Sequence, residues 1–397
     1  MISKEKLQRL LELASVFLKV GSIGFGGMPA IIAMIKSEVT DKRKWLTQDQ
    51  FIDFFGATNL LPGPNTVEIA THVGYLQSGW WGFAIAGLCL VFPSALIAIA
   101  LAILYNEFAS LAEVRPFLDG IKPVVLSLIL LPVYKLGKTA IKHWSLAVIV
   151  IFVIPASILG LNNIIVILLG GFLGMFWLHF YGEFTTKTLV NKPSENSRIR
   201  LPKTLIILLI LLGVFLLIDI LTTSEISLWK FSSFCLKVGS LLYGSGYVLI
   251  AFLQDLVDQF HWLTQQQLLD AIAIGQITPG PLISSVTFIG YLLLGLPGAI
   301  VGTISILLPA FLFSAALNSL LPQMRNFRWT CELLDAINVT SIALMASAFL
   351  TLSRSTLINW QTLLIALCAC LINFRWKLNI ILMIFLGAIS GWILFRF

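Results

Sequence analysis

The chain has 397 residues, of which 58% are hydrophobic and only 11% are charged, and its mean hydropathy is +0.94. Soluble proteins carry roughly 25% charged residues, so this composition excludes an ordinary soluble domain and indicates an integral membrane protein. The formal net charge of +7 comes without a basic helix or an aromatic-interleaved basic run, so basic membrane-flanking loops explain it and no nucleic-acid partner is expected.

Apolar runs long enough to cross a bilayer recur along the chain. A spanning helix needs about 20 apolar residues, and no run shows the alternating pattern of a barrel strand. We therefore predict an all-α integral membrane protein that forms a multi-pass helical bundle. Its expected location is the plasma membrane, which in a bacterium is the inner membrane. We expect the N-terminus to be retained. The clearest runs are 80–105, 145–161, 164–180, 205–220 and 300–317.

The same landmarks occur twice in the chain. The segment Leu18–Ser22, which reads Leu-Lys-Val-Gly-Ser, recurs as Leu236–Ser240, and a Pro-Gly-Pro triplet follows in each copy, at Pro62–Pro64 and Pro279–Pro281. Many membrane transporters build one site at the junction of two such halves. We predict an N-terminal repeat over 1–181, a cytoplasmic linker with a connecting transmembrane helix over 182–228, and a C-terminal repeat over 229–397.

Equivalent loops of the two halves carry opposite charge. The loop 36–50 contains four lysine or arginine residues, whereas its counterpart 254–267 contains Asp255 and Asp258 and neither lysine nor arginine. Basic loops stay in the cytoplasm, so the two loops are expected on opposite sides of the membrane. We therefore predict two inverted-topology repeats whose broken or re-entrant helices meet near the midplane, with segment 48–77 as one re-entrant hairpin.

Each half contains two breaks rich in glycine or proline, at 24–29 and 62–66 in the first half and at 243–247 and 278–285 in the second. A helix that restarts inside a membrane exposes amides that lipid cannot satisfy and that an anion can. The alternative is that the glycines only allow close packing and the prolines only kink helices. The predicted substrate-binding residues at these breaks are Gly26, Gly27, Pro64, Asn65, Thr66, Gly244, Ser245, Thr278, Gly280, Ser284 and Ser285.

Burying an ionisable residue inside an apolar membrane segment costs free energy, so such residues usually have a function. Lys19 and Lys237 are equivalent in the two copies, and we predict that they help bind a dianion unless they reach lipid head groups instead. Glu68 lies one turn into the restarted helix with His72 one turn further, so both are predicted coupling residues for a proton. The alternative for Glu68 is a carboxylate stabilised by the helix dipole.

Neither the histidines nor the cysteines form a cluster. His72, His143, His179 and His261 are dispersed, and the five cysteines have no Cys-x-x-Cys spacing. We therefore predict no metal site, no cofactor and no enzymatic centre.

At the breaks the sequence resembles the chromate transporter (CHR) family. The resemblance rests on segments 25–30 and 59–70 in the first half and on 276–281 and 287–291 in the second, and it covers nearly the whole chain. It implies a two-domain secondary transporter that moves chromate, an oxyanion close in shape to sulfate, out of the cytoplasm. The chain departs from the family pattern at Ile31, where histidine is frequent.

We therefore expect export of chromate or a similar tetrahedral oxyanion by alternating access, with a proton as the expected coupling ion. The alternative is uptake of sulfate or another inorganic anion by cation symport. The expected partners are the oxyanion, the proton and the lipid bilayer, and a homodimer is left open.

Overall fold

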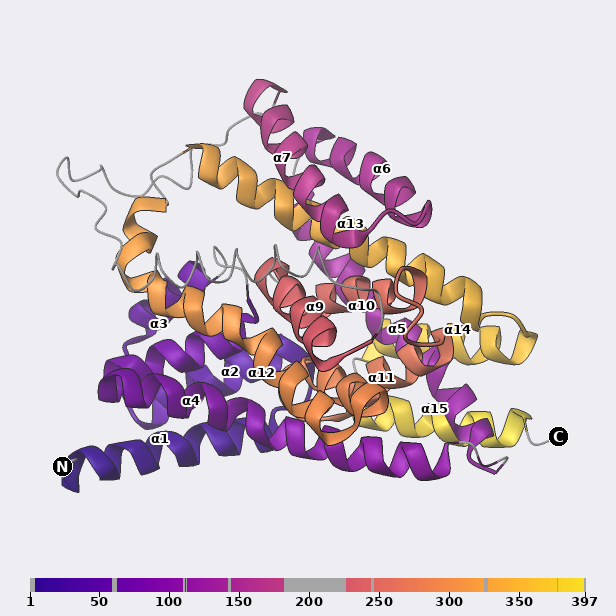
Figure 1. Ribbon diagram of the computed structural model, residues 1–397, viewed down its shortest axis with the longest axis horizontal. Coiled ribbons are helices and arrows are strands. Elements are labelled where there is room, and N and C mark those ends of the chain that lie inside the picture. The colour runs from indigo at the N-terminus through magenta and orange to yellow at the C-terminus, as the bar shows by residue number, and fades with distance from the viewer. Residues whose placement is uncertain are drawn as a thin grey trace.

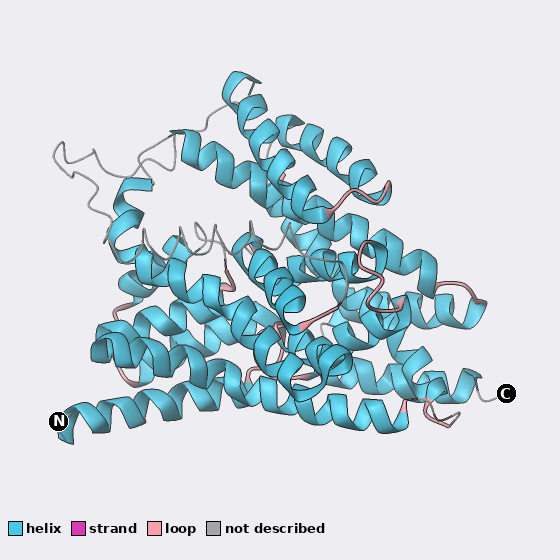
Figure 2. Cartoon of the chain, viewed as in Figure 1, coloured by secondary structure: helices cyan, strands magenta, loops and turns pink. Residues whose placement is uncertain are grey.

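The structure is a computed structural model that describes residues 4–58, 63–109, 111, 113–141, 144–181, 226–243, 246–324, 328–376 and 378–395. The regular elements of these residues are helices, and no β-strand occurs among them (Figure 2). Five helices are long and apolar enough to cross a membrane, and they lie at Asn65–Phe108, Arg115–Ala140, Asn163–Phe180, Ser284–Ala315 and Glu332–Thr356. The predicted all-α, multi-pass membrane fold is confirmed.

The helices of the two halves follow the same order (Figure 1). The first half contains α1 (Lys4–Ile23), α2 (Gly27–Lys36), the π-helical turn η1 (Ser37–Lys42), α3 (Gln48–Thr58), α4 (Asn65–Phe108), α5 (Arg115–Ala140), α6 (Trp144–Ile158) and α7 (Asn163–Tyr181). The second half contains α9 (Leu228–Leu241), the 3₁₀ turn η3 (Gly246–Val248), α10 (Leu249–Asp258), α11 (Gln265–Ile277), α12 (Ser284–Met324), α13 (Arg328–Thr356), α14 (Trp360–Trp376) and α15 (Ile380–Phe395).

Helix α4 folds back on itself near its first third. The backbone leaves helical geometry at Ser78 and Gly79, and Gly79 has a φ of 64°. Gly74 and Gly82 touch, since a Cβ placed on Gly74 would lie 2.1 Å from the carbonyl oxygen of Gly82. Residues eight apart in a straight helix are about 12 Å apart, so residues 65–77 form a short arm that returns along residues 80–108.

Helix α12 contains the same reversal. Its non-helical residue is Gly295, with a φ of 66°, and a Cβ on Gly290 would lie 2.4 Å from the carbonyl oxygen of Gly298. The hydroxyls of Thr287 and Thr303, on the two sides of the reversal, form a hydrogen bond of 2.7 Å. Each half therefore begins its long helix with a short arm, which starts at the Pro-Gly-Pro break.

The two halves interlock. Helix α1 packs along α4 and α9 packs along α12, while α4 and α12 contact each other. Helix α5 packs against α14 and α15 of the second half. Helix α13 in turn packs against α6 and α7 of the first half, and Figure 1 shows it running beneath these two helices. Small residues allow the close contacts, as where Gly120 meets Gly387 and Gly391.

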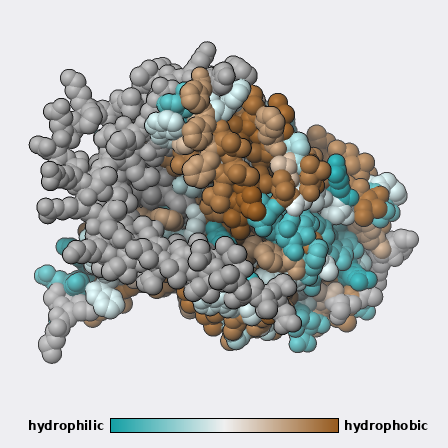
Figure 3. Space-filling model, turned by 45° about the horizontal axis from the view of Figure 1, so that its top comes forward, coloured by the Kyte–Doolittle hydropathy of each residue, from teal (hydrophilic) through white to brown (hydrophobic). Residues whose placement is uncertain are grey.

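Large apolar side chains cover much of the surface, as Figure 3 shows for one face. Phe152 is 72% exposed and Leu173 is 66% exposed, which suits a surface in contact with lipid. The predicted linker and connecting helix fall mostly on residues 182–225, outside the described residues, so the domain boundaries and the inversion of the repeats stay predictions.

The hairpin in α4 predicts a size limit at Gly74. We expect Gly74→Ala to lower the unfolding temperature in detergent, because overpacking a tight contact costs about 1–3 kcal/mol. Gly290→Ala is expected to have the same effect in α12. Gly137→Ala in α5 is the control, since its Cβ would meet only one side-chain atom, at 4.0 Å. Equal unfolding temperatures for all three variants would contradict the packed hairpin.

Candidate functional site

Each Pro-Gly-Pro turn is held by the first break of the other half. The amide of Gly63 donates to the carbonyl oxygen of Leu242 at 2.5 Å, and the amide of Gly280 donates to the carbonyl oxygen of Gly24 at 3.0 Å. Gly63 is equivalent to Gly280 in the repeat, and Gly24 is equivalent to Leu242. Such reciprocal contacts are what a local pseudo-two-fold axis produces.

The long helices support the same turns in the same reciprocal way. A Cβ on Gly63 would lie 3.0 Å from the side chain of Ala310 in α12, and one on Gly280 would lie 3.1 Å from that of Ser94 in α4. Both glycines also have positive φ values, 149° and 95°. Close approach and backbone conformation therefore both require glycine at the centre of each turn.

A small cavity of about 40 Å³ lies where the breaks meet. A buried water needs roughly 10–15 Å³ measured in this way, whereas pockets for organic ligands measure about 300–1,000 Å³. The central cavity therefore suits a small inorganic ion or a few waters and excludes an organic substrate in this conformation. Its lining comes from all four breaks and consists of Gly26, Gly27, Met28, Pro64, Thr66, Gly246, Tyr247, Gly275, Gln276, Thr278, Gly280, Pro281, Leu282 and Ile283.

Neutral hydrogen-bonding groups line this cavity, and none of its described lining residues carries a charged side chain. Gln276 is 6% exposed, and its amide nitrogen Nε2 has no hydrogen-bond partner among the described residues. The Thr278 hydroxyl lies 2.6 Å from that of Ser284 and 3.2 Å from the carbonyl oxygen of Gly275. A buried amide donor without a partner is a position where an anion would be stabilised.

Helix α4 begins at this cavity. The amides of Val67 and Glu68 already donate to the carbonyl oxygen of Pro64, at 2.8 and 3.3 Å. Thr66, in the first turn of α4, lines the cavity and lies at the positive end of the helix dipole. The start of α4 therefore gives the cavity partial positive charge without a charged side chain.

Six of the predicted binding residues line the cavity, namely Gly26, Gly27, Pro64, Thr66, Thr278 and Gly280. Asn65, Ser284 and Ser285 are at most 1% exposed and are not part of the lining. Ser285 packs against Gly275, where a Cβ would lie 1.9 Å from its hydroxyl oxygen. Gly244 and Ser245 lie outside the described residues.

Tyr247, Gly275 and Gln276 line the cavity and were missing from the predicted binding residues. Tyr247 packs on Gly27, where a Cβ would lie 2.8 Å from the phenol oxygen, so it joins the first break of one half to that of the other. One sequence signal pointed to Gln276. It is equivalent to Asn59, so each half has an amide side chain shortly before its Pro-Gly-Pro turn.

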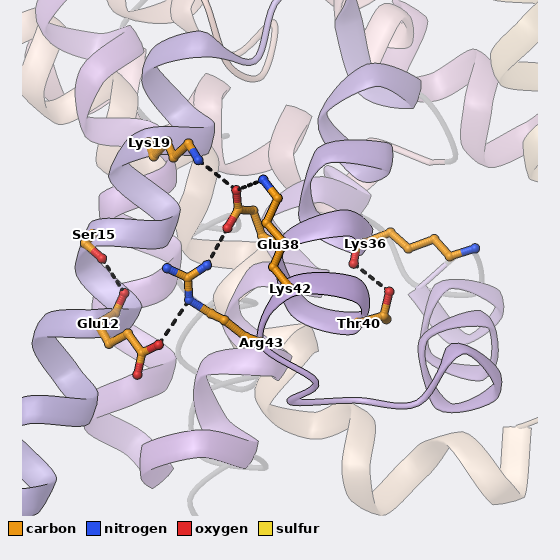
Figure 4. A network of polar contacts seen from close by, with 8 residues as sticks. All are labelled: Glu12, Ser15, Lys19, Lys36, Glu38, Thr40, Lys42 and Arg43. Carbon is orange, nitrogen blue, oxygen red and sulfur yellow. Dashed lines mark hydrogen bonds and ion pairs between the residues drawn. The ribbon is translucent and has the colours of Figure 1, made fainter.

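The two predicted lysine ligands do not line the cavity. Lys19 donates to Glu38 at 2.9 Å, and Lys42 and Arg43 bind the same carboxylate (Figure 4). The side chain of Glu38 is 6% exposed, and hydrogen bonds from Lys42 and Lys19 lower its pKa to about 2. This cluster fastens α1 to η1 and neutralises Lys19, while Lys237 is half-buried on α9.

Glu68 and His72 belong to the first two turns of α4 and are not part of the cavity lining. Glu68 is fully buried with its Oε1 atom against Gly63, and neither carboxyl oxygen has a hydrogen-bond partner among the described residues. His72 is 3% exposed, and its ring lies edge-on to that of Phe54, with 4.1 Å between centroids. An ionised carboxylate without a partner is costly to bury, so the neutral acid suits this position.

A second, larger cavity of about 560 Å³ adjoins the central cavity and is called the vestibule below. The two cavities share Gly26, Met28 and Tyr247. The rest of the vestibule is formed by Phe25, Pro29, Leu128, Leu131, Pro132, Lys135, Leu136, Asn373, Leu378, Asn379 and Ile380.

These features define a multi-pass membrane protein in which two similar halves enclose, at their junction, a small cavity with several neutral hydrogen-bonding groups. A family model described as chromate transporter matches residues 11–175 and 229–392. The chain belongs to the chromate transporter family, and this membership supports chromate transport as its activity.

Relatives over nearly the full length carry corresponding names. A probable chromate transport protein of Synechococcus elongatus is 29% identical, over 96% of this chain and 95% of the relative. Chromate transport proteins of Cupriavidus metallidurans and Pseudomonas aeruginosa are 27% and 28% identical, over 93% and 97% of this chain and 88% and 92% of the relatives. No solved structure matches the chain.

The cluster around Glu38 predicts a pH-dependent stability difference. The pKa of Glu38 is lowered from 4.5 to about 2, so its contribution is complete above about pH 4.5 and is lost as the pH falls through 2. We expect Glu38→Gln to lower the unfolding temperature at pH 7, with a gap to wild type that narrows below pH 4.5. Glu12→Gln, at a 47% exposed side chain, is the control and should change little. A gap independent of pH would contradict this role.

Proposed function

We propose that this protein exports chromate, or a similar tetrahedral oxyanion, across the cell membrane by alternating access, with the anion held in the central cavity. The observation that carries the proposal is the meeting of four helix breaks around a cavity of about 40 Å³ lined with neutral donors. Helix starts and amide donors bind oxyanions without the desolvation penalty of a buried ion pair.

The two repeats supply the moving parts of this mechanism. In this mechanism the helices of the two halves shift against each other at the breaks, where Gly63 and Gly280 each make one reciprocal hydrogen bond, in a rocking motion. If the repeats are inverted, as the loop charges predict, the same rocking opens the cavity to one face and then to the other.

The membrane potential favours the outward direction for a dianion. Moving two negative charges out of an interior-negative cell releases roughly 4.6 kcal/mol per 100 mV. Uptake of sulfate by cation symport is the alternative, and it must work against the same potential. The family and the names of the relatives give it no support.

Glu68 is the proposed proton carrier. It is fully buried, its Oε1 lies against the Gly63 turn, and the hydroxyl of Thr71 on the next turn bonds Ser314 of α12 at 2.7 Å. A proton gained or lost at Glu68 would change the charge beside the turn that bounds the cavity. Such a change would bias the position of α4 relative to α12.

The binding role predicts a transport defect in Gln276→Leu. In proteoliposomes with radiolabelled chromate and sulfate, we expect the apparent KM for chromate to rise about tenfold or more, because a hydrogen bond to a charged group contributes about 1.5–3 kcal/mol. Gln266→Leu is the matched control, since Gln266 is exposed on the same helix. Unchanged chromate transport by Gln276→Leu would refute the binding site.

The coupling role predicts that Glu68→Gln removes the pH dependence of transport. Chromate flux should still run down an imposed potential, because an uncharged amide mimics the protonated acid and leaves the cavity lining intact. Glu107→Gln, at an exposed position on the same helix, should keep the wild-type pH profile. A wild-type profile in Glu68→Gln would end the proton-carrier proposal.

A further inference from the structure

The vestibule has a buried end and an exposed end. Leu128 of α5 lines it and is 4% exposed, whereas Lys135, almost two turns further along the same helix, is exposed. Seven residues of α-helix advance about 10 Å. The vestibule therefore runs from the central cavity, where it shares Tyr247 and the first break, to the protein surface at Lys135.

Lys135 is the one charged residue among the described residues that line the vestibule. The two asparagines of the lining are engaged in structure, since Asn373 donates to the carbonyl oxygen of Ser127 at 3.0 Å and Asn379 accepts from the amide of Ile381 at 3.1 Å. No carboxylate lies among the described lining residues. The vestibule therefore has a single positive charge, placed at its mouth.

The sequence indicates which face this mouth opens to. Lys135 and Lys138 lie in the last two turns of α5, and Lys142 follows two residues after its end. A cluster of three lysines at the end of a membrane-spanning helix favours the cytoplasmic side. This is the face from which an exported anion arrives.

We propose that the vestibule is the cytoplasmic access path for the oxyanion, and that Lys135 captures the anion at its mouth. The proposal rests on the proposed export function and adds the route and a positioning residue. A lysine ammonium is a strongly hydrated point charge on a flexible stem, so it attracts an anion without holding it tightly. A positive charge at the mouth of a narrow, low-dielectric passage raises the local anion concentration.

Thiol labelling tests the access path independently of the substrate. Leu131 lines the vestibule and is half-buried, so Leu131→Cys places a thiol inside the path. We expect a membrane-impermeant, negatively charged methanethiosulfonate to modify this thiol in inside-out vesicles and not in right-side-out vesicles. The wild type gives the background from native cysteines. Labelling only from the outer face, or no labelling above background from either face, overturns the path.

Transport kinetics test the role of Lys135. In proteoliposomes with radiolabelled chromate, Lys135→Ala should raise KM about three- to tenfold at low ionic strength with kcat unchanged, and the effect should shrink in high salt. Lys135→Arg should restore KM. Lys138→Ala is the matched control, an exposed lysine on the same helix outside the vestibule lining, and should change KM less than twofold.

The outcomes separate the two proposals. An unchanged KM in Lys135→Ala, or an equal change in Lys138→Ala, overturns capture by Lys135 while chromate transport stands. A fall in kcat without a salt-dependent KM overturns it as well, because that pattern indicates a structural role. Absence of chromate flux in the wild type overturns the proposed function and the capture role together, and the labelling result then decides whether the path exists.

Discussion

The architecture depends on satisfying backbone amides at the points where helices are interrupted. In lipid an unpaired amide costs several kcal/mol, so a broken helix is stable only where protein or a bound ion supplies the acceptor. Here the central glycine of each Pro-Gly-Pro turn donates to a carbonyl oxygen at the first break of the opposite half. Each Pro-Gly-Pro turn therefore needs the other repeat to supply an acceptor for its central amide. This mutual dependence places all four breaks around one cavity.

The absence of charged side chains from the described lining has consequences for turnover. A buried lysine would attract a dianion strongly, but it would also need its own compensation whenever the site was empty. Amides, hydroxyls and the start of α4 cost less than a buried charge when the site is empty, and they still favour negative charge. Three cations of the first half are used elsewhere: Lys19, Lys42 and Arg43 converge on Glu38 and fasten the α1–η1 junction.

The sequence predicted much of the fold and part of the site. The repeated landmarks and the apolar runs predicted the helical membrane bundle, and the proline and glycine clusters located the breaks, because those residue types act locally on the backbone. The exchange of α5 and α13 between the halves was not predictable, since the hydropathy of a helix does not record which of several apolar helices it packs against. Lys19 illustrates the same limit: its partner Glu38 lies across a turn, and hydropathy does not record that pairing.

Equivalent positions in the two halves have diverged, which gives the two halves different properties. Glu38 and Asp255 both lie seven residues before a Trp-Leu-Thr sequence. Glu38 binds three cations, whereas Asp255 accepts from the backbone and side-chain amides of Asn163 at 3.4 and 2.8 Å, at the start of α7. The first junction is held by ion pairs and the second by hydrogen bonds from uncharged amides, so salt acts on them unequally. The two halves therefore share a similar core, while the junctions in front of it differ in their chemistry.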